Sequence, residues 1–216
     1  MLRLGDIKVT IKRFVILRGI SMDIPAGGLV GLVGRNGAGK TTTLKSIMGI
    51  VPVTGGSIQF DGEDLLRVPG HWRARMGIGY MPEDRRLIGS LTVRDNILMP
   101  AWAINLKTAD QRLDYIHGLM PELSPLLKRR ASMLSGGQQK MVALARALMS
   151  GTKLLLLDEP FEGLSPGLGE KLGETIRQLQ QDGLTVLMAE SDAKRISFAE
   201  KTYEIERGEN VDGSGS

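Results

Sequence analysis

Apolar runs of strand length alternate along this chain with segments of helical periodicity, and turns rich in glycine or proline separate them. Leu29–Val33, Lys153–Asp158 and Leu184–Ala189 are nearly continuous apolar runs, which is typical of strands buried on both faces of a parallel sheet. Residues 166–181 instead repeat leucine and isoleucine at helical intervals. Strands that alternate with helices predict an α/β fold built on a parallel sheet.

The N-terminal part of the chain has a looser pattern. Ile7–Thr10 and Ile16–Ile24 alternate apolar and polar residues, as edge strands of an antiparallel sheet do. Ser57–Gly62 and Met76–Met81 predict two further short strands, and Pro82 ends the second of them. We therefore expect an N-terminal antiparallel β part in addition to the parallel sheet.

Residues 87–150 change character, because they read as helices and loops with no convincing strand. Thr92 is suited to cap one helix, and Thr108–Gln111 has the spacing of a capping box at the start of another. We interpret this stretch as an inserted α-helical subdomain within a single domain of 216 residues. The expected parts are a core of residues 1–86 and 151–210, the helical subdomain 87–150 and a flexible tail 211–216.

Composition narrows the class of protein. The hydrophobic share of 42% and the charged share of 24% are ordinary for a soluble globular domain, and no apolar run approaches the roughly 18 residues of a membrane span. Met1–Asp6 lacks the apolar stretch of a signal peptide. The lack of cysteine excludes disulfides and thiolate metal sites, and it is compatible with the cytosol.

The net charge of +4 does not by itself indicate a nucleic-acid partner. The basic residues occur in scattered groups without interleaved aromatic residues, which make up only 4% of the chain. We interpret each group as a solvated surface and expect no nucleic acid to bind. The groups are Arg73 with Arg75, Arg85–Arg86 and Lys128–Arg130.

Gly34–Thr41 reads G-x-x-x-x-G-K-T, the phosphate-binding P-loop pattern, and it lies between an apolar strand and a helical segment. Such glycines let backbone N–H groups point at phosphates, and the helix N-terminus adds a partial positive charge. Lys40 would reach the β- and γ-phosphates, and the Thr41 hydroxyl would ligate Mg²⁺. The alternative is a chance glycine turn, which the flanking strand and helix disfavour. The predicted nucleotide-binding residues here are Asn36, Gly37, Ala38, Gly39, Lys40, Thr41 and Thr42.

Asp158 and Glu159 supply a second half of this predicted site. Asp158 ends an apolar strand, so its carboxylate emerges at the carboxyl edge of the sheet, where open α/β sheets bind ligands. An aspartate there can hold Mg²⁺, and Glu159 can orient or deprotonate the water that attacks the γ-phosphate. The alternative is an Asp-Glu pair that caps the next turn, and the upstream P-loop favours the catalytic interpretation.

Leu134–Gln139 reads L-S-G-G-Q-Q and precedes an apolar-rich helix. A serine hydroxyl and glycine N–H groups at a helix start form an anion site. Taken alone, the stretch is equally well an ordinary Ser-Gly-Gly helix entry. Its position before the strand at 154–158, in a chain with a P-loop, favours anion binding. The candidate residues are Ser135, Gly136, Gly137 and Gln138.

Gly34–Thr41, Leu134–Gln139 and Leu154–Pro160 together resemble, in order and spacing, the Walker A, signature and Walker B motifs of an ABC-transporter ATPase. The resemblance extends over residues 4–210 and implies a RecA-like P-loop NTPase core. The subgroup that the chain resembles most is the ATPase subunits of branched-chain amino acid importers. The phrases that carry this likeness are Pro82–Arg86 with Leu91–Val93, Arg146–Met149 and Asp158–Pro166.

The resemblance implies a nucleotide-sandwich dimer, formed as a homodimer or with a homologous ATPase subunit. In such a dimer, Ser135–Gln138 of one chain close on the ATP held by the P-loop of the other. ATP and Mg²⁺ are the implied ligands, transmembrane permease subunits are the implied partners, and the implied location is the cytoplasmic face of the membrane. Closure on ATP and reopening on hydrolysis would then drive the permease. The alternative is a nucleotide-gated regulatory or assembly module of the same superfamily, without a transport role.

Glu83 departs from the pattern of many relatives, which carry glutamine at the loop between the core and the helical subdomain. The resembling subgroup also tends to show glutamate there, and Glu83 could reach Mg²⁺ or the attacking water. The predicted metal ligands are therefore Thr41, Asp158 and Glu83.

Ser191 falls at the switch position, which is commonly histidine in the family. A serine can hydrogen-bond a phosphate but cannot act as a base at neutral pH, so more of the catalytic role falls to Glu159. We keep Glu159 and Ser191 as the catalytic candidates. The adenine-stacking aromatic residue of the family aligns near Ile11, which leaves Phe14 as the possible substitute.

Overall fold

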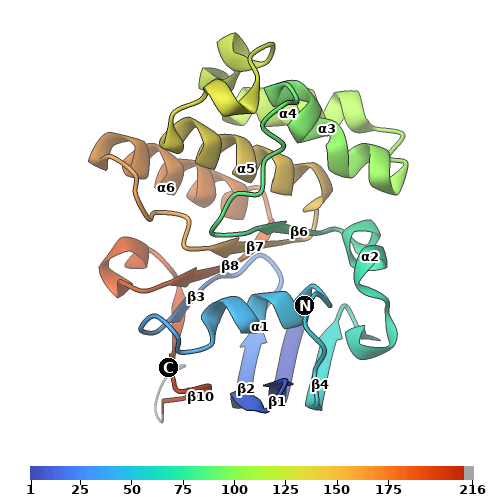
Figure 1. Ribbon diagram of the computed structural model, residues 1–216, viewed down its shortest axis with the longest axis vertical. Helices are drawn as coiled ribbons and strands as arrows, with labels where there is room; N and C mark the ends of the chain where they lie inside the picture. Colours follow the sequence, from blue (N-terminus) through green and yellow to red (C-terminus); the bar gives the residue numbers. More distant parts are fainter. Residues whose placement is uncertain (212–216) are drawn as a thin grey trace.

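A computed structural model describes residues 1–211 of the chain, and its centre is one ten-stranded sheet (Figure 1). The strands lie in the order β5-β4-β1-β2-β10-β9-β3-β8-β7-β6. Their bounds are β1 Leu2–Ile11, β2 Phe14–Ile24, β3 Leu29–Val33, β4 Gly55–Phe60, β5 Glu63–Asp64, β6 Ile78–Met81, β7 Leu154–Asp158, β8 Thr185–Glu190, β9 Lys201–Glu206 and β10 Glu209–Asn210. The α-helices are α1 Lys40–Ile47, α2 Gly70–Arg73, α3 Val93–Ile104, α4 Ala109–Leu119, α5 Gly136–Ser150 and α6 Pro166–Gln181.

One half of the sheet is parallel, as the continuous apolar runs predict. β3 pairs in parallel with β8 and β9, β8 with β7, and β7 with β6. Residues of β7 and β8 are buried throughout, since helices lie on both faces of this half. Parallel strands end at one edge, so the segments that follow β3, β7 and β8 meet there.

The other half is antiparallel, and here the expectation of edge strands is wrong. β1 pairs antiparallel with β2 on one side and with β4 on the other, and β2 pairs further with β10 in the parallel sense. Both strands are therefore interior, and β5 and β6 form the edges of the described sheet. Alternation along β1 reflects one face packed on the core and one face exposed, which occurs at any position in an antiparallel sheet.

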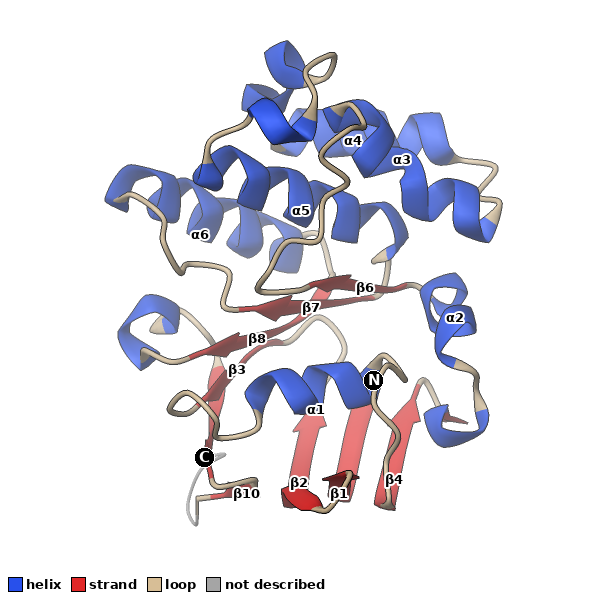
Figure 2. Ribbon diagram, viewed as in Figure 1, coloured by secondary structure: helices blue, strands red, loops and turns tan. Residues whose placement is uncertain are grey.

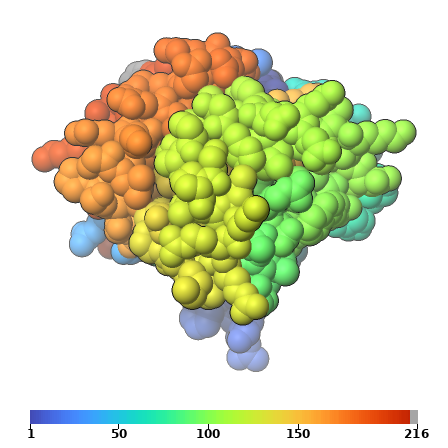
Figure 3. Space-filling view, turned by 90° about the horizontal axis from the view of Figure 1, so that it is seen from above, coloured from blue at the N-terminus to red at the C-terminus, as the bar shows by residue number. Residues whose placement is uncertain are grey.

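Two apolar cores lie on opposite sides of the parallel strands. The first packs α3, α4, α5 and α6 against the sheet, and the second packs α1 against the opposite face and the antiparallel strands. Figure 2 shows α1 on one side of β3, β8 and β7, with α5 and α6 on the other. Seen from above, the chain from α3 to α6 covers one end of the molecule (Figure 3).

Helix starts show which local signals hold. Thr92 caps α3 as expected, because its hydroxyl accepts a hydrogen bond from Asp95 N at 3.1 Å. Thr108 precedes α4 but makes no capping bond, so the predicted capping box there is wrong. Ser135 and Gln138 form a capping box instead, at the start of α5. α6 spans the predicted residues 166–181.

The interpretation of the basic groups as solvated surface is wrong for Arg73. This side chain is 4% exposed, and its guanidinium donates to carbonyls at the C-terminal end of α1 and in residues 65–68. It thereby satisfies acceptors that a helix end leaves without intrahelical partners. Arg75 is exposed as expected, and it stacks on Trp72.

The last two expectations concern the C-terminal tail and the absence of a membrane-spanning segment. The tail predicted from residue 211 lies, apart from Val211, outside the described residues. Among the helices of residues 1–211, none combines the length and apolar character that a membrane crossing needs.

Candidate nucleotide-binding site

The P-loop connects β3 to α1 at the carboxyl edge of the parallel strands (Figure 1). Gly37 and Gly39 have φ angles of 83° and 114°. Residues with a side chain are strained at such positive φ angles, so the curl of this loop requires glycine at both positions. The loop opens onto a cavity of about 450 Å³. The cavity is lined by Ile16, Asn36, Gly37, Gly39, Lys40, Thr41, Thr42, Glu83, Glu159 and Glu162.

Most predicted residues of this half-site thus surround one cavity. Ala38 is the exception within the loop: it is 5% exposed and packs in the core beneath, with its N–H donating to Arg35 O at 3.0 Å. At the apolar side of the cavity the lining residue is Ile16, and neither Ile11 nor Phe14 contributes to it. Phe14 is 72% exposed at the β1–β2 turn.

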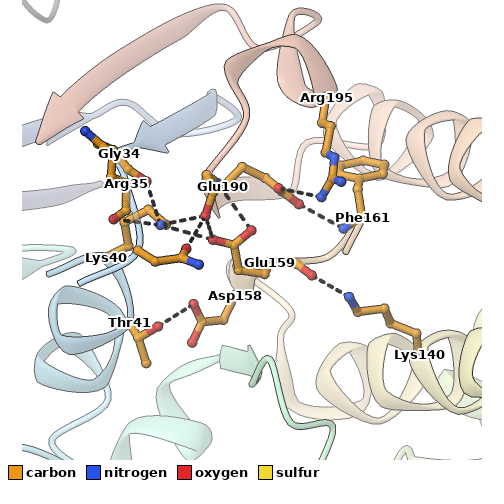
Figure 4. Close-up of polar contacts among 12 residues, drawn as sticks. Gly34, Arg35, Lys40, Thr41, Lys140, Asp158, Glu159, Phe161, Glu190 and Arg195 are labelled. Atoms are coloured by element: carbon orange, nitrogen blue, oxygen red, sulfur yellow. Dashed lines mark hydrogen bonds and ion pairs between the residues drawn. The ribbon is translucent and has the colours of Figure 1, made fainter. Parts of the chain in front are cut away.

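Lys40 is the cation at the centre of the site (Figure 4). Its ammonium donates to Gly34 O at 2.7 Å and to Ser191 Oγ at 3.0 Å, and it lies 3.1 Å from Glu159 Oε1. The side chain is 6% exposed. The lysine that is predicted to bind phosphate is therefore in direct contact with both predicted catalytic residues, one directly after β7 and the other directly after β8.

Asp158 lies at the end of β7 and is fully buried. Thr41 donates its hydroxyl to one carboxylate oxygen at 2.9 Å, and Tyr80 donates to the other at 3.1 Å. Burial raises the pKa of Asp158, while the hydrogen bonds from Thr41 and Tyr80 oppose that rise. A hydroxyl and a carboxylate are the hard oxygen ligands that Mg²⁺ takes alongside substrate phosphates and water, so these residues suit that ion.

The described residues hold no cluster of three or more acidic or histidine side chains arranged for a metal. Glu83 is exposed at the rim of the cavity. Burial, followed by the nearby charges of Glu162 and Asp158, raises the pKa of Glu83. Its negative neighbours make Glu83 an electrostatically favourable place for a cation.

Glu159 follows directly in the left-handed backbone region, with a φ of 47°. Its N–H donates to Ala189 O at 2.9 Å, and its carboxylate accepts from Ser191 N at 3.2 Å and from Ser191 Oγ at 2.5 Å. Burial works to raise the pKa of Glu159, but the hydrogen bond from Ser191 and the contact with Lys40 bring the pKa below its ordinary value. Glu159 is therefore held as an ionised carboxylate beside the P-loop.

Glu190, at the end of β8, is a buried acid that the sequence analysis missed. It is fully buried, and its Oε1 accepts from Phe161 N at 2.9 Å. Arg195 lies 3.6 Å from Oε2. Burial and then the neighbouring Glu159 raise the pKa of Glu190 to about 8, so the pair carries one proton at neutral pH. The only sequence signal that could have indicated Glu190 is its place at the end of an apolar strand, directly before Ser191.

The segment Ser135–Gln138 lies outside this cavity. The Ser135 hydroxyl accepts from Gln138 N at 3.2 Å, and the Gln138 side chain accepts from Ser135 N at 3.0 Å, which completes the capping box. Ser135 and Gly136 are exposed, and none of the four residues lines the P-loop cavity. One chain therefore presents the P-loop site and the serine-glycine helix start as two separate surfaces.

The sequence did not predict two other residues that contact the site, because each lies on an element that is distant in sequence from the residue it contacts. Tyr80, on β6, binds Asp158 across two neighbouring parallel strands. Lys140, on α5, donates to the backbone carbonyl of Glu159. A lysine within an otherwise apolar helical stretch was a usable signal for Lys140.

The parallel sheet and the loop between β3 and α1 define a P-loop nucleotide-binding protein. Comparison with known proteins agrees, since the ABC transporter family description matches residues 17–162. The solved dimeric structure of the ABC transporter cassette MJ0796 superposes with a TM-score of 0.88 at 25% sequence identity, and the match covers 97% of this chain and 96% of that one.

Several relatives are similar over most of their length. The branched-chain amino acid transport ATP-binding protein BraG of Pseudomonas aeruginosa is 36% identical over 212 residues, which are 98% of this chain and 91% of that protein. LivF of Archaeoglobus fulgidus, a probable protein of the same kind, is 34% identical with coverage of 96% and 89%. The lipopolysaccharide export ATP-binding protein LptB of Escherichia coli is 36% identical with coverage of 89% and 81%.

The chain belongs to the ABC transporter family, and it is an ATP-binding subunit that hydrolyses ATP to drive transport.

Proposed function

We propose that this subunit powers the import of branched-chain or related amino acids, and that hydrolysis occurs at the Lys40–Glu159–Ser191 site. The observation that carries the catalytic part is the contact of Lys40 with both Glu159 and Ser191 at the edge of the parallel sheet. These side chains lie at the position that the γ-phosphate of a nucleotide bound to the P-loop would occupy.

Glu159 acts on the attacking water, because its lowered pKa keeps it ionised and able to accept a proton or orient the water. Ser191 holds that carboxylate through both its N–H and its hydroxyl. Lys40 binds the β- and γ-phosphates and exchanges its present carboxylate partner for them. P-loop N–H groups and Thr42 complete the phosphate site.

Thr41 and Asp158 are the residues that would hold Mg²⁺, and Glu83 lines the rim of the same cavity. When bound, the ion neutralises charge that builds up on the phosphate oxygens. Tyr80 orients the Asp158 carboxylate through its hydrogen bond.

A second ATP-binding chain completes each site. Support comes from the exposed Ser135–Gly136 helix start, which lies outside its own chain's cavity and presents N–H groups suited to a phosphate. The relative MJ0796 is known as a dimer. The partner is a second copy of this chain or a homologous subunit.

A permease subunit docks in the apolar groove between the C-terminal end of α1, β6, α3 and α5. This groove has a volume of about 350 Å³, and its lining includes Met48, Ile50, Met99 and Pro100. Ile50 lines this groove and is 54% exposed, so its apolar side chain is accessible to a partner. Docking there places the subunit on the cytoplasmic face of a membrane.

The solute is proposed from similarity alone, since this chain does not contact it. BraG and LivF are transport ATP-binding proteins for branched-chain amino acids and match 98% and 96% of this chain, whereas LptB matches 89% at the same identity as BraG. Uptake of labelled leucine, isoleucine and valine into vesicles carrying the chain with its co-purified permease tests the proposal. Lack of uptake despite active hydrolysis would rule out the amino-acid assignment.

Glu159→Gln tests the catalytic part. We expect phosphate release to fall at least 100-fold while MgATP still drives the chain into dimers, as measured by size-exclusion chromatography. Glu63→Gln, on the exposed edge strand β5, is the matched control and should behave as the parent chain. Normal hydrolysis by Glu159→Gln, or a chain that hydrolyses ATP but stays monomeric, would overturn the proposed site or the proposed dimer respectively.

A further inference from the structure

Lys140 is a buried cation that binds backbone rather than a carboxylate. Its side chain is 2% exposed on α5, and its ammonium donates to Glu159 O and to Glu162 O, both at 2.6 Å. Figure 4 shows the side chain reaching from α5 to the segment that follows β7. Among residues 1–211, no ion pair involves Lys140.

Such a side chain is costly to place here. Its neighbours Met141, Ala143 and Leu144 are buried and apolar, and burial lowers the pKa of Lys140. An apolar residue of similar length would fill the same space without that cost. The two hydrogen bonds are therefore the reason that an amine suits this position.

The two carbonyls belong to the turn that carries Glu159. Glu159 itself has a φ of 47°, and Glu162 N donates back to Glu159 O at 3.3 Å to close the turn. Non-glycine residues in the left-handed region carry a conformational cost, and they persist only when surrounding contacts hold them. Lys140 donates to the carbonyls at the two ends of this turn, so it fixes the backbone from which the Glu159 carboxylate projects.

The other end of the link is the start of α5. Lys140 follows Ser135 by five residues, so about 7.5 Å of helix axis separates them at 1.5 Å per residue. The capping box makes that first turn of the helix well defined. Any displacement of Ser135–Gln138 is therefore passed through one rigid turn of helix to the Glu159 turn of the same chain.

We infer that Lys140 is a positioning residue that couples the serine-glycine helix start to Glu159. The inference rests on the proposed dimer: when Ser135–Gln138 close on the nucleotide of the partner, Lys140 sets the position of Glu159 over the nucleotide of its own chain. The two ATP sites are thereby linked through one side chain. No proton or bond changes hands at Lys140 itself.

The test uses Lys140→Met, which keeps the length and apolar packing of the side chain and removes both hydrogen bonds. We expect kcat to fall at least tenfold, with the KM for MgATP and the stoichiometry of ATP binding within threefold of the parent chain. MgATP should still drive dimers when Lys140→Met is combined with Glu159→Gln. Lys140→Arg, which can donate to both carbonyls, should keep kcat within threefold. Lys171→Met, on the exposed face of α6, is the matched control.

A purely structural role predicts another pattern. It would lower the thermal midpoint and the number of ATP-binding chains while leaving kcat per bound ATP unchanged, and that result would overturn the inference. Lys140→Gln is made in parallel. It serves as a second variant without the double hydrogen bond in case Lys140→Met does not fold. A folded variant with kcat within threefold of the parent also overturns it. The proposed function is tested separately by Glu159→Gln in the same assay. If Glu159→Gln abolishes hydrolysis while the Lys140 variants keep the parent kcat, the inference about Lys140 fails and the proposed function stands.

Discussion

Lys40 Nζ lies 3.1 Å from Glu159 Oε1, and both side chains are less than 10% exposed. The P-loop lysine and the carboxylate that follows β7 therefore form one buried ion pair, although 119 positions separate them in the chain. Phosphates that bind the P-loop compete with Glu159 for this ammonium. In the proposed mechanism, binding of the substrate thereby frees the Glu159 carboxylate to act on the attacking water.

Lys40→Met is expected to weaken MgATP binding about 10-fold to 100-fold. A hydrogen bond between charged groups is worth about 1.5–3 kcal/mol, and at least one such bond to phosphate is lost. Equilibrium dialysis or fluorescence with a labelled ATP analogue measures the change. Lys107→Met, an exposed position after α3, is the control and should leave affinity unchanged. Undiminished binding by Lys40→Met would mean that Lys40 does not face the phosphates.

Arg73→Met is expected to lower the free energy of unfolding by about 3 kcal/mol. The change removes the guanidinium donors from buried carbonyls at the end of α1 and in residues 65–68. Ser46 O and Leu65 O each keep one backbone donor, but the loss of so many buried hydrogen bonds to a charged group is still among the more damaging single changes. Urea denaturation measures it. Arg75→Met should cost no more than about 1 kcal/mol, because Arg75 is exposed and loses only its stacking on Trp72. Equal losses for the two arginines would contradict the assignment.

Local patterns predicted those parts of the fold in which neighbours in sequence decide the structure. The P-loop, α6 and the Thr92 cap depend on short stretches, and they were predicted from the sequence. The interior position of β1 and β2 depends on β4 and β10, whose pairing partners are far along the chain. No alternation pattern distinguishes an interior antiparallel strand from an edge strand, so that expectation failed.

The site divides in the same way. Lys40, Asp158 and Glu159 stand in recognisable motifs, and the sequence placed them correctly at one edge of the sheet. Tyr80 and Glu190 carry no motif, and only strand order brings them to that edge. The roles assigned to Glu83 and to Ser135–Gln138 remain predictions, because they concern a bound ion and a second chain.

Glu190→Gln is expected to flatten the dependence of stability on pH. The pKa of Glu190 is raised to about 8 from an ordinary value near 4.5, first by burial and then by Glu159. Between those values the folded chain holds a proton that the unfolded chain has lost. The free energy of unfolding of the parent therefore falls as pH rises, by up to about 1.4 kcal/mol per pH unit.

Glutamine cannot titrate, and its amide oxygen can still accept from Phe161 N. Denaturation at pH 5, 6, 7 and 8 should thus show Glu190→Gln gaining on the parent chain toward the alkaline end. Glu174→Gln, exposed on α6, is the control and should run parallel to the parent. A parallel profile for Glu190→Gln would show that Glu190 is ionised throughout this range in the folded chain.

Ser191→Ala is expected to lower kcat about tenfold while the KM for MgATP stays within threefold. The hydroxyl donates to Glu159 Oε1, whereas the backbone N–H of the same residue still donates to Oε2 after substitution, so the carboxylate keeps one of two restraints. Loss of one hydrogen bond to a charged group corresponds to roughly a factor of ten. Steady-state phosphate release over a range of MgATP measures both constants, with the exposed Ser197→Ala as the control. If KM rises in proportion while kcat holds, Ser191 binds the nucleotide and does not position Glu159.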